Sequence, residues 1–232
     1  MIVRIEDTLN HIHNKDCIPG MRFLPGESID LIITDPPFAI DFTSTRHNYH
    51  RKAARVLEGY SEITVSKYPV FTKRWMTQAH RVLKESGAMF VFSGWNNLKD
   101  LLVAADSLGF ITVNHLIWKY QFGVFCKRRF VSSHYHCLYL CKNEQKRKFF
   151  YNSRFGPDAR TDAGRSLRYR DMEDVWEIPR EYWHGDMKTP TKLLAELVRK
   201  ILAYASEPGD IVLDPFLGSG QVAVVCREMG RQ

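Results

Sequence analysis

A carboxylate, two prolines and an aromatic ring follow directly on a predicted strand. The strand covers 28–34 (SIDLIIT), a short β-branched apolar run, and it is ended by Asp35, Pro36, Pro37 and Phe38. Because the prolines fix the backbone, the Asp35 carboxylate, the Pro36 carbonyl oxygen and the Phe38 ring keep a constant relation. A planar exocyclic amino group can donate one hydrogen bond to each of those two oxygens while its base stacks on the ring. The tetrapeptide predicts a site that grips an aromatic amine; the alternative is a proline-stiffened strand exit without chemistry.

A glycine-rich turn follows a second predicted strand near the other end of the sequence. The strand covers 210–214 (DIVLD), and 215–220 (PFLGSG) lead into a helix predicted from about Gln221. The glycines let the backbone turn tightly and approach a ligand, and the helix N-terminus offers free N–H groups to a carboxylate or phosphate. The spacing matches neither the dinucleotide fingerprint nor a Walker loop, since no Gly-Lys-Ser/Thr follows. Alone, the turn is not specific for any ligand.

Both motifs lie in a chain whose predicted strands and helices alternate. This alternation predicts a parallel α/β sheet. Ligands bind beyond the carboxyl ends of the strands in such sheets, which is where both motifs lie. The predicted strands are 28–34, 87–93, 110–118, 131–142 and 210–214; the predicted helices are 69–84, closed by Ser86 and Gly87, then 97–109, about 191–205 and from about 221, with 150–175 as loop.

Length and composition are those of an ordinary globular protein. The chain has 232 residues, 44% hydrophobic and 25% charged, so we expect one domain, or one domain with an insertion. No apolar stretch approaches the roughly 18 residues of a membrane span. Residues 1–17 carry acids and lack the apolar core of a signal peptide. We therefore expect a cytoplasmic protein.

The cysteines do not form a recognisable framework. There are five, scattered along the chain, which argues against disulfides and for reduced thiols. The densest group of metal-ligand residue types is His134, His136, Cys137 and Cys141. Alternation along a strand places the histidines on one face and the cysteines on the other, so no metal site is predicted.

Positive charge gathers in one part of the chain. Of the net charge of +7, +6 falls within 119–183, which holds 14 Lys or Arg against 8 Asp or Glu. These cations, which include the run 146–148, are interleaved with Phe, Tyr and His. That composition is typical of a nucleic-acid surface, although a solvated, loop-rich face is the alternative. A second basic stretch, 43–58, is predicted to be a long loop. The candidate DNA-binding residues are Arg46, Arg51, Lys52, Lys127, Arg128, Arg129, Arg165, Arg168 and Arg170.

The order of these features resembles that of the circularly permuted β class of DNA amino-methyltransferases. In that family (Asp/Asn/Ser)-Pro-Pro-(Tyr/Phe) precedes the target-recognition region and Phe-x-Gly-x-Gly comes last. The resemblance covers nearly the whole chain. Further segments match: 14–17 (NKDC) resembles the opening Gly-Asp-Cys, 81–87 (RVLKESG) resembles Arg-Val-Leu-Lys-x-x-Gly, and 184–194 (HGDMKTPTKLL) resembles His-Pro-Thr-Gln-Lys-Pro-x-x-Leu.

The resemblance implies a fold and a division of the chain. The fold is a Rossmann-like S-adenosylmethionine-dependent methyltransferase sheet with helices on both faces. Residues 1–118 and 184–232 form the catalytic domain, without the family's last strand, and 119–183 form an inserted target-recognition region.

The resemblance also implies which residues bind the cofactor. Counting from His184 places Lys188 at the family's cofactor-touching lysine, whereas counting back from Pro190 places Thr189 there. The implied cofactor-binding residues are Asp16, Cys17, Asp35, Lys188, Thr189, Pro190, Asp214, Phe216, Gly218, Ser219 and Gly220, and the implied catalytic residues are Asp35, Pro36, Pro37 and Phe38.

The implied reaction transfers the methyl group of S-adenosylmethionine to the exocyclic amino nitrogen of a flipped base in double-stranded DNA. Hydrogen bonds to Asp35 and the Pro36 carbonyl would favour a pyramidal nitrogen and stabilise its developing charge. Phe38 would replace the lost stacking. We expect Asp35 to act as an electrostatic stabiliser rather than a general base, because a carboxylate with an ordinary pKa of about 4 is a weak proton acceptor.

Several alternatives stay open. Asp at position 35 favours adenine N6 over cytosine N4, since family members that act on cytosine more often carry Ser there. The family's last strand supplies an acidic residue that binds the cofactor ribose, and this chain stops at Gln232. A DNA-binding protein that has the fold but binds no cofactor is therefore a second hypothesis. Methylation of RNA or of a protein amide is a third, the amide being weaker because those enzymes typically carry Asn first. A homodimer and a cognate restriction enzyme are expectations from the family alone.

Overall fold

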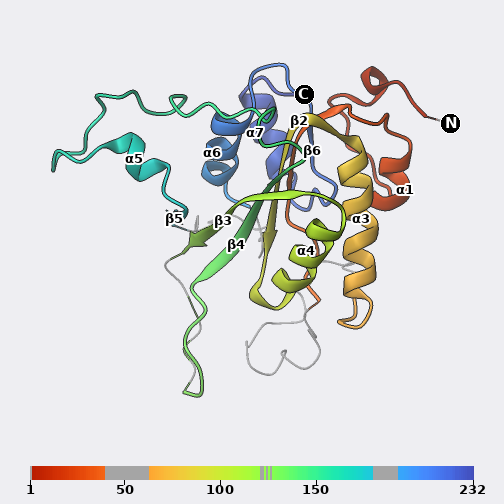
Figure 1. Cartoon of the computed structure of the whole chain (residues 1–232), viewed down its shortest axis with the longest axis horizontal. Coiled ribbons are helices and arrows are strands. Elements are labelled where there is room, and N and C mark those ends of the chain that lie inside the picture. The colour runs from red at the N-terminus through yellow and green to blue at the C-terminus, as the bar shows by residue number, and fades with distance from the viewer. Residues whose placement is uncertain (1, 40–62, 121–122, 124, 126, 180–192) are drawn as a thin grey trace, which may run out of the picture.

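The computed structural model describes residues 2–39, 63–120, 123, 125, 127–179 and 193–232. Its centre is a six-stranded sheet in the order β5-β3-β4-β2-β1-β6 (Figure 1). The strands are β1 (Ile29–Thr34), β2 (Leu83–Ser93), β3 (Ile111–Lys119), β4 (His134–Cys141), β5 (Val175–Glu177) and β6 (Val212–Leu213). The helices are η1 (Ile5–Thr8), α1 (Cys17–Arg22), α3 (Tyr68–Val82), α4 (Trp95–Ser107), α5 (Leu167–Asp171), α6 (Ala195–Ala205) and α7 (Gln221–Glu228).

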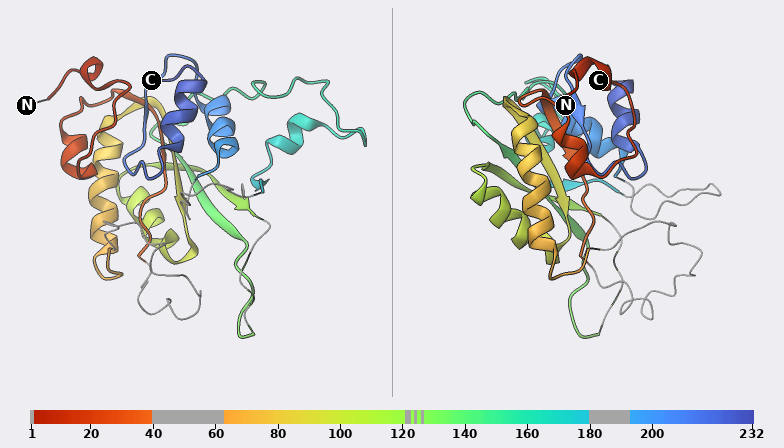
Figure 2. Two further views of the ribbon diagram at one scale, coloured as in Figure 1. Left: turned by 180° about the vertical axis from the view of Figure 1, so that it is seen from behind. Right: turned by 90° about the vertical axis from the view of Figure 1, so that its right-hand side faces the viewer.

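Strand β1 is buried throughout because helices cover both faces of the sheet, and its apolar residues are Ile29 and Leu31 to Ile33. Leu31 and Ile33 pack in the core that includes α6 and α7, whereas Ile32 packs in the core that includes α1, α3 and α4. Figure 2 shows α3 and α4 on one side of the sheet and α6 and α7 on the other. The predicted α/β fold with helices on both faces is confirmed.

The prediction of a wholly parallel sheet is wrong for one strand. β4 pairs antiparallel with both of its neighbours, β2 and β3, while the other pairings, β1 with β2, β1 with β6 and β3 with β5, are parallel. A parallel neighbour needs a crossover, usually a helix. The described residues between β3 and β4 form no helix, so the chain reverses directly into a hairpin.

The boundary between α3 and β2 differs from the prediction. The sequence suggested that Ser86 and Gly87 close a helix, but the helix ends at Val82 and β2 begins at the next residue. Gly87 lies inside the strand. A Cβ there would stand 2.9 Å from the Asp30 carbonyl oxygen of β1, so close approach of the strands explains the glycine.

Residues 142–174 leave the sheet and return to it (Figure 1). They were predicted to be loop over 150–175, but they include the short helix α5, and β5 begins at Val175 and adds an edge strand beside β3. Strand β4 precedes this excursion and lies within the sheet, between β2 and β3. None of the helices among the described residues is long and apolar enough to cross a membrane.

Candidate functional site

The two sequence motifs meet at one edge of the sheet. β1 and β6 run parallel, with Leu31 opposite Val212 and Ile32 opposite Leu213. Asp35 follows β1 and Asp214 follows β6, so both carboxylates lie at the carboxyl edge. Pairing of the strands thus brings together residues from opposite ends of the sequence, at the edge where ligands bind in open α/β sheets.

One oxygen of the Asp35 carboxylate has no partner among the described residues. This oxygen, Oδ1, is buried. Burial, followed by the nearby Asp214 carboxylate, raises the pKa of Asp35 to about 8. The site therefore holds an acceptor oxygen that no described residue uses, which is the state expected of a group that binds a ligand.

Asp214 is held in place by its neighbours. Its Oδ1 atom accepts hydrogen bonds from the Phe216 amide at 3.0 Å and from the Thr34 hydroxyl at 3.0 Å. Burial raises the pKa of Asp214 to about 7 even though both of these hydrogen bonds lower it. Two carboxylates thus face one low-dielectric site, and neither forms an ion pair with a described residue.

These pKa values correct one premise of the sequence analysis. Asp35 was taken to have an ordinary pKa and hence to be a weak proton acceptor. With its pKa raised to about 8, Asp35 is mostly protonated at pH 7 and must lose that proton before it can accept another. A cationic ligand beside the pair would lower both pKa values, because opposite charge favours the ionised carboxylates.

The glycine-rich turn has the backbone geometry that its sequence suggested. Gly218 and Gly220 adopt φ angles of 52° and 76°, in the left-handed region that favours glycine. α7 begins directly afterwards at Gln221, so its first N–H groups open toward this turn. Phe216 anchors the turn, since its ring packs edge-on against Trp75 of α3 at 5.5 Å between centroids. The turn is thereby fixed next to Asp214.

Phe38 stands at the start of an aromatic cluster. Its ring lies 5.9 Å from that of Tyr135, which in turn lies 5.6 Å from Trp118 and 5.3 Å from Tyr120. A Cβ at Gly94 would come within 3.9 Å of the Phe38 ring, so the exit of β2 also borders it. Pro36 is buried and Pro37 half-buried beside it. The Asp-Pro-Pro-Phe motif therefore contacts Tyr135 of β4, and Tyr135 in turn contacts Trp118 and Tyr120 at the end of β3.

Asp16 and Cys17 lie at the start of α1. The Asp16 carboxylate accepts the Ile18 amide hydrogen at 2.8 Å and caps the helix. Burial, and after it the Asp16 charge, raises the pKa of the Cys17 thiol to about 12, so this cysteine is a packing residue rather than a nucleophile. No described hydrogen bond or ion pair joins these two residues to the Asp35–Asp214 pair.

Some predicted site residues lie outside the described residues. They are Arg46, Arg51, Lys52, Lys188, Thr189 and Pro190.

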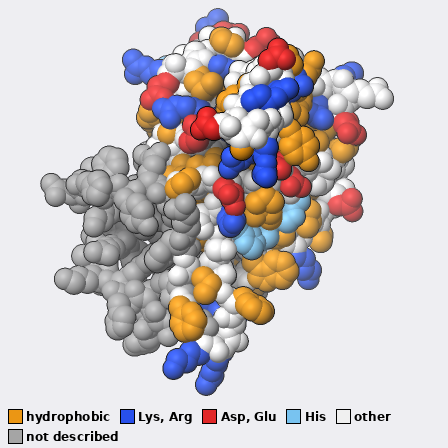
Figure 3. Space-filling model, turned by 90° about the vertical axis from the view of Figure 1, so that its left-hand side faces the viewer, with side chains coloured by type: hydrophobic (Ala, Val, Ile, Leu, Met, Phe, Trp, Pro, Cys, Tyr) orange, Lys and Arg blue, Asp and Glu red, His pale blue; other side chains and the backbone are white. Residues whose placement is uncertain are grey.

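The described basic residues fall into two kinds. Lys127, Arg128 and Arg129 are exposed beyond the ends of β3 and β4, and Arg165 is exposed ahead of α5. Figure 3 shows basic and hydrophobic side chains together at the lower end of one face, where the connection between β3 and β4 projects. Arg168 instead donates to Asn152 at 2.8 Å within the 142–174 segment.

Arg170 borders an open cavity of about 580 Å³ between the 142–174 segment and α6. The cavity wall also contains Trp176 and Lys200, and the Lys200 ammonium lies 4.8 Å from the centre of the Trp176 ring. In contrast, the predicted basic run 146–148 is partly engaged within the protein: the Arg147 guanidinium donates to the Tyr139 hydroxyl at 2.8 Å, and Lys148 pairs with Asp210.

Two site residues escaped the sequence analysis. Thr34 is fully buried and orients Asp214, and Tyr135 links Phe38 to the neighbouring strands. A polar β-branched residue at the end of an apolar strand, directly before the Asp-Pro-Pro motif, is a usable signal for Thr34. Tyr135 could be found only by knowing that β4 lies near β1.

His134 and His136 of β4 share a face, as alternation predicted, and His115 of β3 lies beside them. The Nε2 atom of His115 and the Nδ1 atom of His136 are 2.7 Å apart, and the His134 ring lies 5.0 Å from that of His136. Burial, then His115 and His134, lowers the pKa of His136 to about 4. Cys137 packs in the opposite core. Among the described residues no group of three or more metal-ligand side chains is placed to hold an ion.

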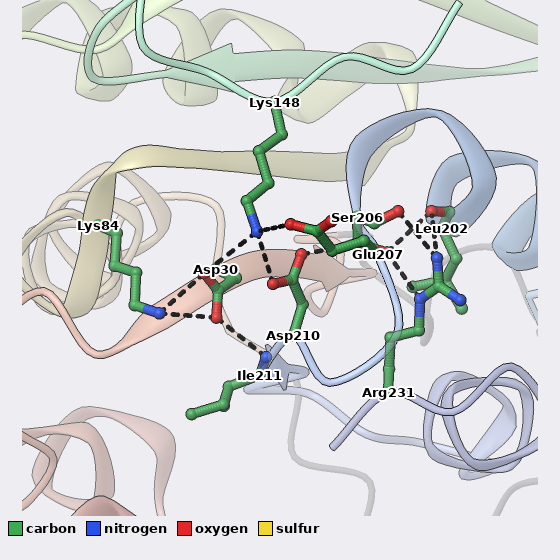
Figure 4. Close-up of polar contacts among 9 residues, drawn as sticks. All are labelled: Asp30, Lys84, Lys148, Leu202, Ser206, Glu207, Asp210, Ile211 and Arg231. Atoms are coloured by element: carbon green, nitrogen blue, oxygen red, sulfur yellow. Dashed lines mark hydrogen bonds and ion pairs between the residues drawn. The ribbon is translucent and has the colours of Figure 1, made fainter. Parts of the chain in front are cut away.

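The opposite edge of the same two strands is built differently (Figure 4). The Lys84 ammonium lies 2.8 Å from both oxygens of Asp30, which also accepts the Ile211 amide hydrogen at 3.0 Å. The Lys148 ammonium lies 2.6 Å from Asp210 and 2.8 Å from Glu207. Burial lowers the pKa of Lys148, but its hydrogen bonds to these two acids outweigh that effect and raise it.

Comparison with known proteins agrees with this architecture. The sequence model of the DNA methylase family matches residues 29–232. The chain is 28% identical to the type II methyltransferase M.HinfI of Haemophilus influenzae over 98% of its own length, and it spans 64% of that relative. The fold resembles that of PvuII DNA methyltransferase, described as cytosine-N4-specific, with a TM-score of 0.70 at 18% identity over 94% of this chain and 78% of that one. It also resembles the M1.HpyAVI–SAM complex, with a TM-score of 0.62 at 20% identity over 96% and 90%. The chain therefore belongs to the N6-adenine/N4-cytosine DNA methylase family.

Proposed function

We propose that this chain transfers the methyl group of S-adenosylmethionine to an exocyclic amino nitrogen of a base in double-stranded DNA, and that the base is adenine. One observation carries the proposal. A buried carboxylate oxygen without a partner, on Asp35, stands at the carboxyl edge beside the Pro36 carbonyl and the Phe38 ring. A site that binds an aromatic amino group needs a hydrogen-bond acceptor without a partner, a second acceptor in a fixed position and a ring on which the base can stack.

The site also fits the cofactor. S-adenosylmethionine supplies a methyl group on a positively charged sulfonium. Asp35 and Asp214 place two carboxyl groups close together, and neither forms an ion pair with a described residue. Gly218 and Gly220, which have positive φ angles and no side chains, let a ligand approach the backbone beside them. Such a pair of carboxyl groups favours a bound positive charge. By family resemblance the cofactor would also be held by Asp16, Cys17, Lys188, Thr189, Pro190, Phe216 and Ser219.

Asp35, Pro36 and Phe38 have separate roles in this proposal. Asp35 and the Pro36 carbonyl each accept one hydrogen of the amino group, which orients the nitrogen lone pair and stabilises the positive charge that develops on it. The nitrogen loses one proton on methylation. The positive charge of the sulfonium would favour the ionised form of Asp35, which can then accept that proton. Phe38 stacks on a base that has left the helix. Asp at this position is the feature that favours adenine.

DNA binding is assigned to exposed cations of the 119–183 target-recognition region. Lys127, Arg128, Arg129 and Arg165 are exposed and available for phosphates. Within that region, β4 and β5 belong to the catalytic sheet. Target recognition is therefore proposed for the two parts that leave the sheet: the connection between β3 and β4, and the 142–174 segment.

The test is transfer of labelled methyl from S-adenosylmethionine to unmethylated genomic DNA, followed by nucleoside analysis. The matched variants are Asp35→Asn and Asp106→Asn; Asp106 is an exposed carboxylate on α4. N6-methyladenine that persists in Asp106→Asn and disappears in Asp35→Asn supports the proposal. N4-methylcytosine with the same dependence on Asp35 overturns the choice of base and keeps the reaction. No methylated product, together with DNA binding, overturns the reaction in favour of a binding protein that has this fold.

A further inference from the structure

The connection between β3 and β4 is a projecting hairpin, which we define by its described residues, 120, 123, 125 and 127–133. Its base is closed by a hydrogen bond from the Tyr120 amide to the Ser133 carbonyl at 3.0 Å. A Cβ placed on Gly123 would collide with Val131 and lie 2.7 Å from the Ser132 carbonyl oxygen, so the two arms run against each other there. Figures 1 and 2 show the hairpin extending away from the sheet and the helices.

The hairpin carries apolar surface that contributes nothing to the described core. Phe130 is 100% exposed and Phe125 is 77% exposed. A fully exposed phenylalanine contributes no hydrophobic stabilisation to the fold. Large apolar side chains that are exposed near one another often mark a binding surface.

The same tip is strongly cationic. Lys127, Arg128 and Arg129 precede Phe130 directly and are exposed. None of the three forms an ion pair with a described residue. Three cations without a described ion pair, next to an exposed phenylalanine ring, are complementary to duplex DNA. Its phosphates are anionic, and the faces of its bases are flat and apolar.

The hairpin leaves the sheet at the edge that carries the candidate site. β3 runs parallel to β5 and antiparallel to β4, which is antiparallel to β2, so the end of β3 lies at the same edge as the end of β1. At the other end of the hairpin, Tyr135 contacts the Phe38 ring. DNA that places a base on Phe38 therefore lies within reach of the hairpin.

The length of the hairpin suits this geometry. Phe130 lies five residue steps before Tyr135, and an extended chain spans about 3.3 Å per step, which gives a reach of roughly 16 Å. The major and minor grooves of DNA are about 8.5 Å and 7.5 Å deep. The tip can therefore reach the base stack while the base of the hairpin stays against Phe38.

We propose that Phe130 inserts between base steps of the bound duplex as a wedge while Lys127, Arg128 and Arg129 hold the adjacent phosphates. Apolar wedges of this kind partly unstack and kink DNA, which assists extrusion of a nearby base. The inference deepens the proposed function, on which its choice of duplex DNA rests.

The experiment separates insertion from phosphate binding. The protein is bound to relaxed closed-circular plasmid, a type IB topoisomerase re-equilibrates the DNA, and the change in linking number per bound protein reports unwinding. Affinity for a labelled duplex is measured in parallel by anisotropy at several salt concentrations. The variants are Phe130→Ala, Phe130→Trp and Lys127→Ala. Phe23→Ala, an exposed ring at the end of α1, is the matched control.

Each variant has its own expected signature. Phe130→Ala loses the linking-number change and weakens binding roughly 5-fold or more without altering the salt slope. Phe130→Trp retains the linking-number change. Lys127→Ala reduces the slope of log K against log salt by about 0.9 and keeps the unwinding per bound protein. Phe23→Ala matches the unchanged protein in both measurements.

The contrary outcomes are equally distinct. Unwinding that persists in Phe130→Ala, or no unwinding by the unchanged protein when it saturates the plasmid, overturns the wedge. Methyl transfer is assayed on the same preparations. Methylation without Phe130-dependent unwinding refutes the wedge alone, whereas Phe130-dependent unwinding without methylation refutes the proposed reaction and leaves the wedge standing.

Discussion

The two edges of strands β1 and β6 use the same residue type in opposite ways. At the amino edge, Asp30 and Asp210 are paired with Lys84 and Lys148 at 2.6–2.8 Å. At the carboxyl edge, Asp35 and Asp214 face each other, and neither pairs with a described cation. The pKa values of the second pair are raised to about 8 and about 7. Similar carboxylates, a few residues apart on the same strands, are compensated at one edge and left uncompensated at the other.

This difference indicates what each edge is for. A buried carboxylate without a partner costs stability, because desolvation of the charge is not offset. The fold places lysines against Asp30 and Asp210 but no described cation against Asp35, so this cost falls at the candidate site. The amino edge holds the strands together, and under the proposed function the carboxyl edge binds a cation and an amino group.

Replacement of Asp35 should have the largest effect. Asp35→Asn keeps the shape but removes the charge and the proton acceptor. Loss of one electrostatic stabiliser in a buried site typically lowers the rate by about 10²- to 10³-fold, and we expect at least this loss in methyl transfer under single-turnover conditions. Because an uncompensated carboxylate is removed, the urea midpoint should not fall. A variant that unfolds more easily and keeps its rate would reverse the assignment of this edge.

Removal of Asp30 should have the next largest effect, and on stability instead. Asp30→Ala leaves the Lys84 ammonium and the Ile211 amide without their acceptor. Breaking a buried, hydrogen-bonded pair costs about 3–5 kcal/mol. Because Lys84 is partly exposed, we expect about 2–3 kcal/mol in the free energy of unfolding, measured by urea titration. Methyl transfer per folded molecule should be unchanged; a matching loss of rate would show that the two edges are coupled.

The pH dependence of stability should reveal the uncompensated pair. The folded pKa values of Asp35 and Asp214 lie above the unfolded value of about 4, so the native state holds more protons than the unfolded chain between about pH 4 and pH 8. The free energy of unfolding therefore falls as pH rises through that window, by about 1.4 kcal/mol per pH unit for each extra proton.

Asp214→Asn sharpens this test. The variant removes one titrating group and the repulsion on Asp35, so the slope between pH 5 and pH 7 should become shallower by about 1.4 kcal/mol per pH unit. Urea titrations at several pH values measure it, with Asp106→Asn as the exposed control. An unchanged slope in Asp214→Asn would mean that the pair at the carboxyl edge is not the source of the dependence.

The sequence predicted the site better than its energetics. Apolar runs ended by proline or glycine located β1 and the turn before α7, and the rule that ligands bind at carboxyl ends placed Asp35 and Asp214 together. Local signals were sufficient there because each motif is contiguous. The raised pKa of Asp35 was not predictable, since it depends on burial and on the distance to a residue at the other end of the chain.

Features that depend on pairing across the fold were missed for the same reason. The direction of β4 follows from a direct hairpin, which the periodicity of 131–142 cannot distinguish from a crossover. The pairing of Lys148 with Asp210 was hidden in a basic run that resembled a DNA surface. Charge composition reports where cations lie in the sequence, and only the folded chain shows which of them are already neutralised.

The smallest expected effect tests whether an ion pair must be buried, as at the amino edge, to stabilise the fold. Lys119 at the end of β3 and Glu177 on β5 form an ion pair of 2.6 Å, as short as that of Lys148 with Asp210, but both side chains are more than half exposed. The hydrogen bond and charge of Lys119 lower the pKa of Glu177, so any stabilisation would be present at neutral pH and lost on acidification. Exposed pairs contribute little, and we expect Glu177→Gln to leave the urea midpoint unchanged at pH 7. A fall in the Glu177→Gln midpoint as large as that of Asp30→Ala would show that a short ion pair stabilises the protein equally whether it is exposed or buried. The missing ion pair at Asp35, rather than burial, would then explain the difference between the two edges.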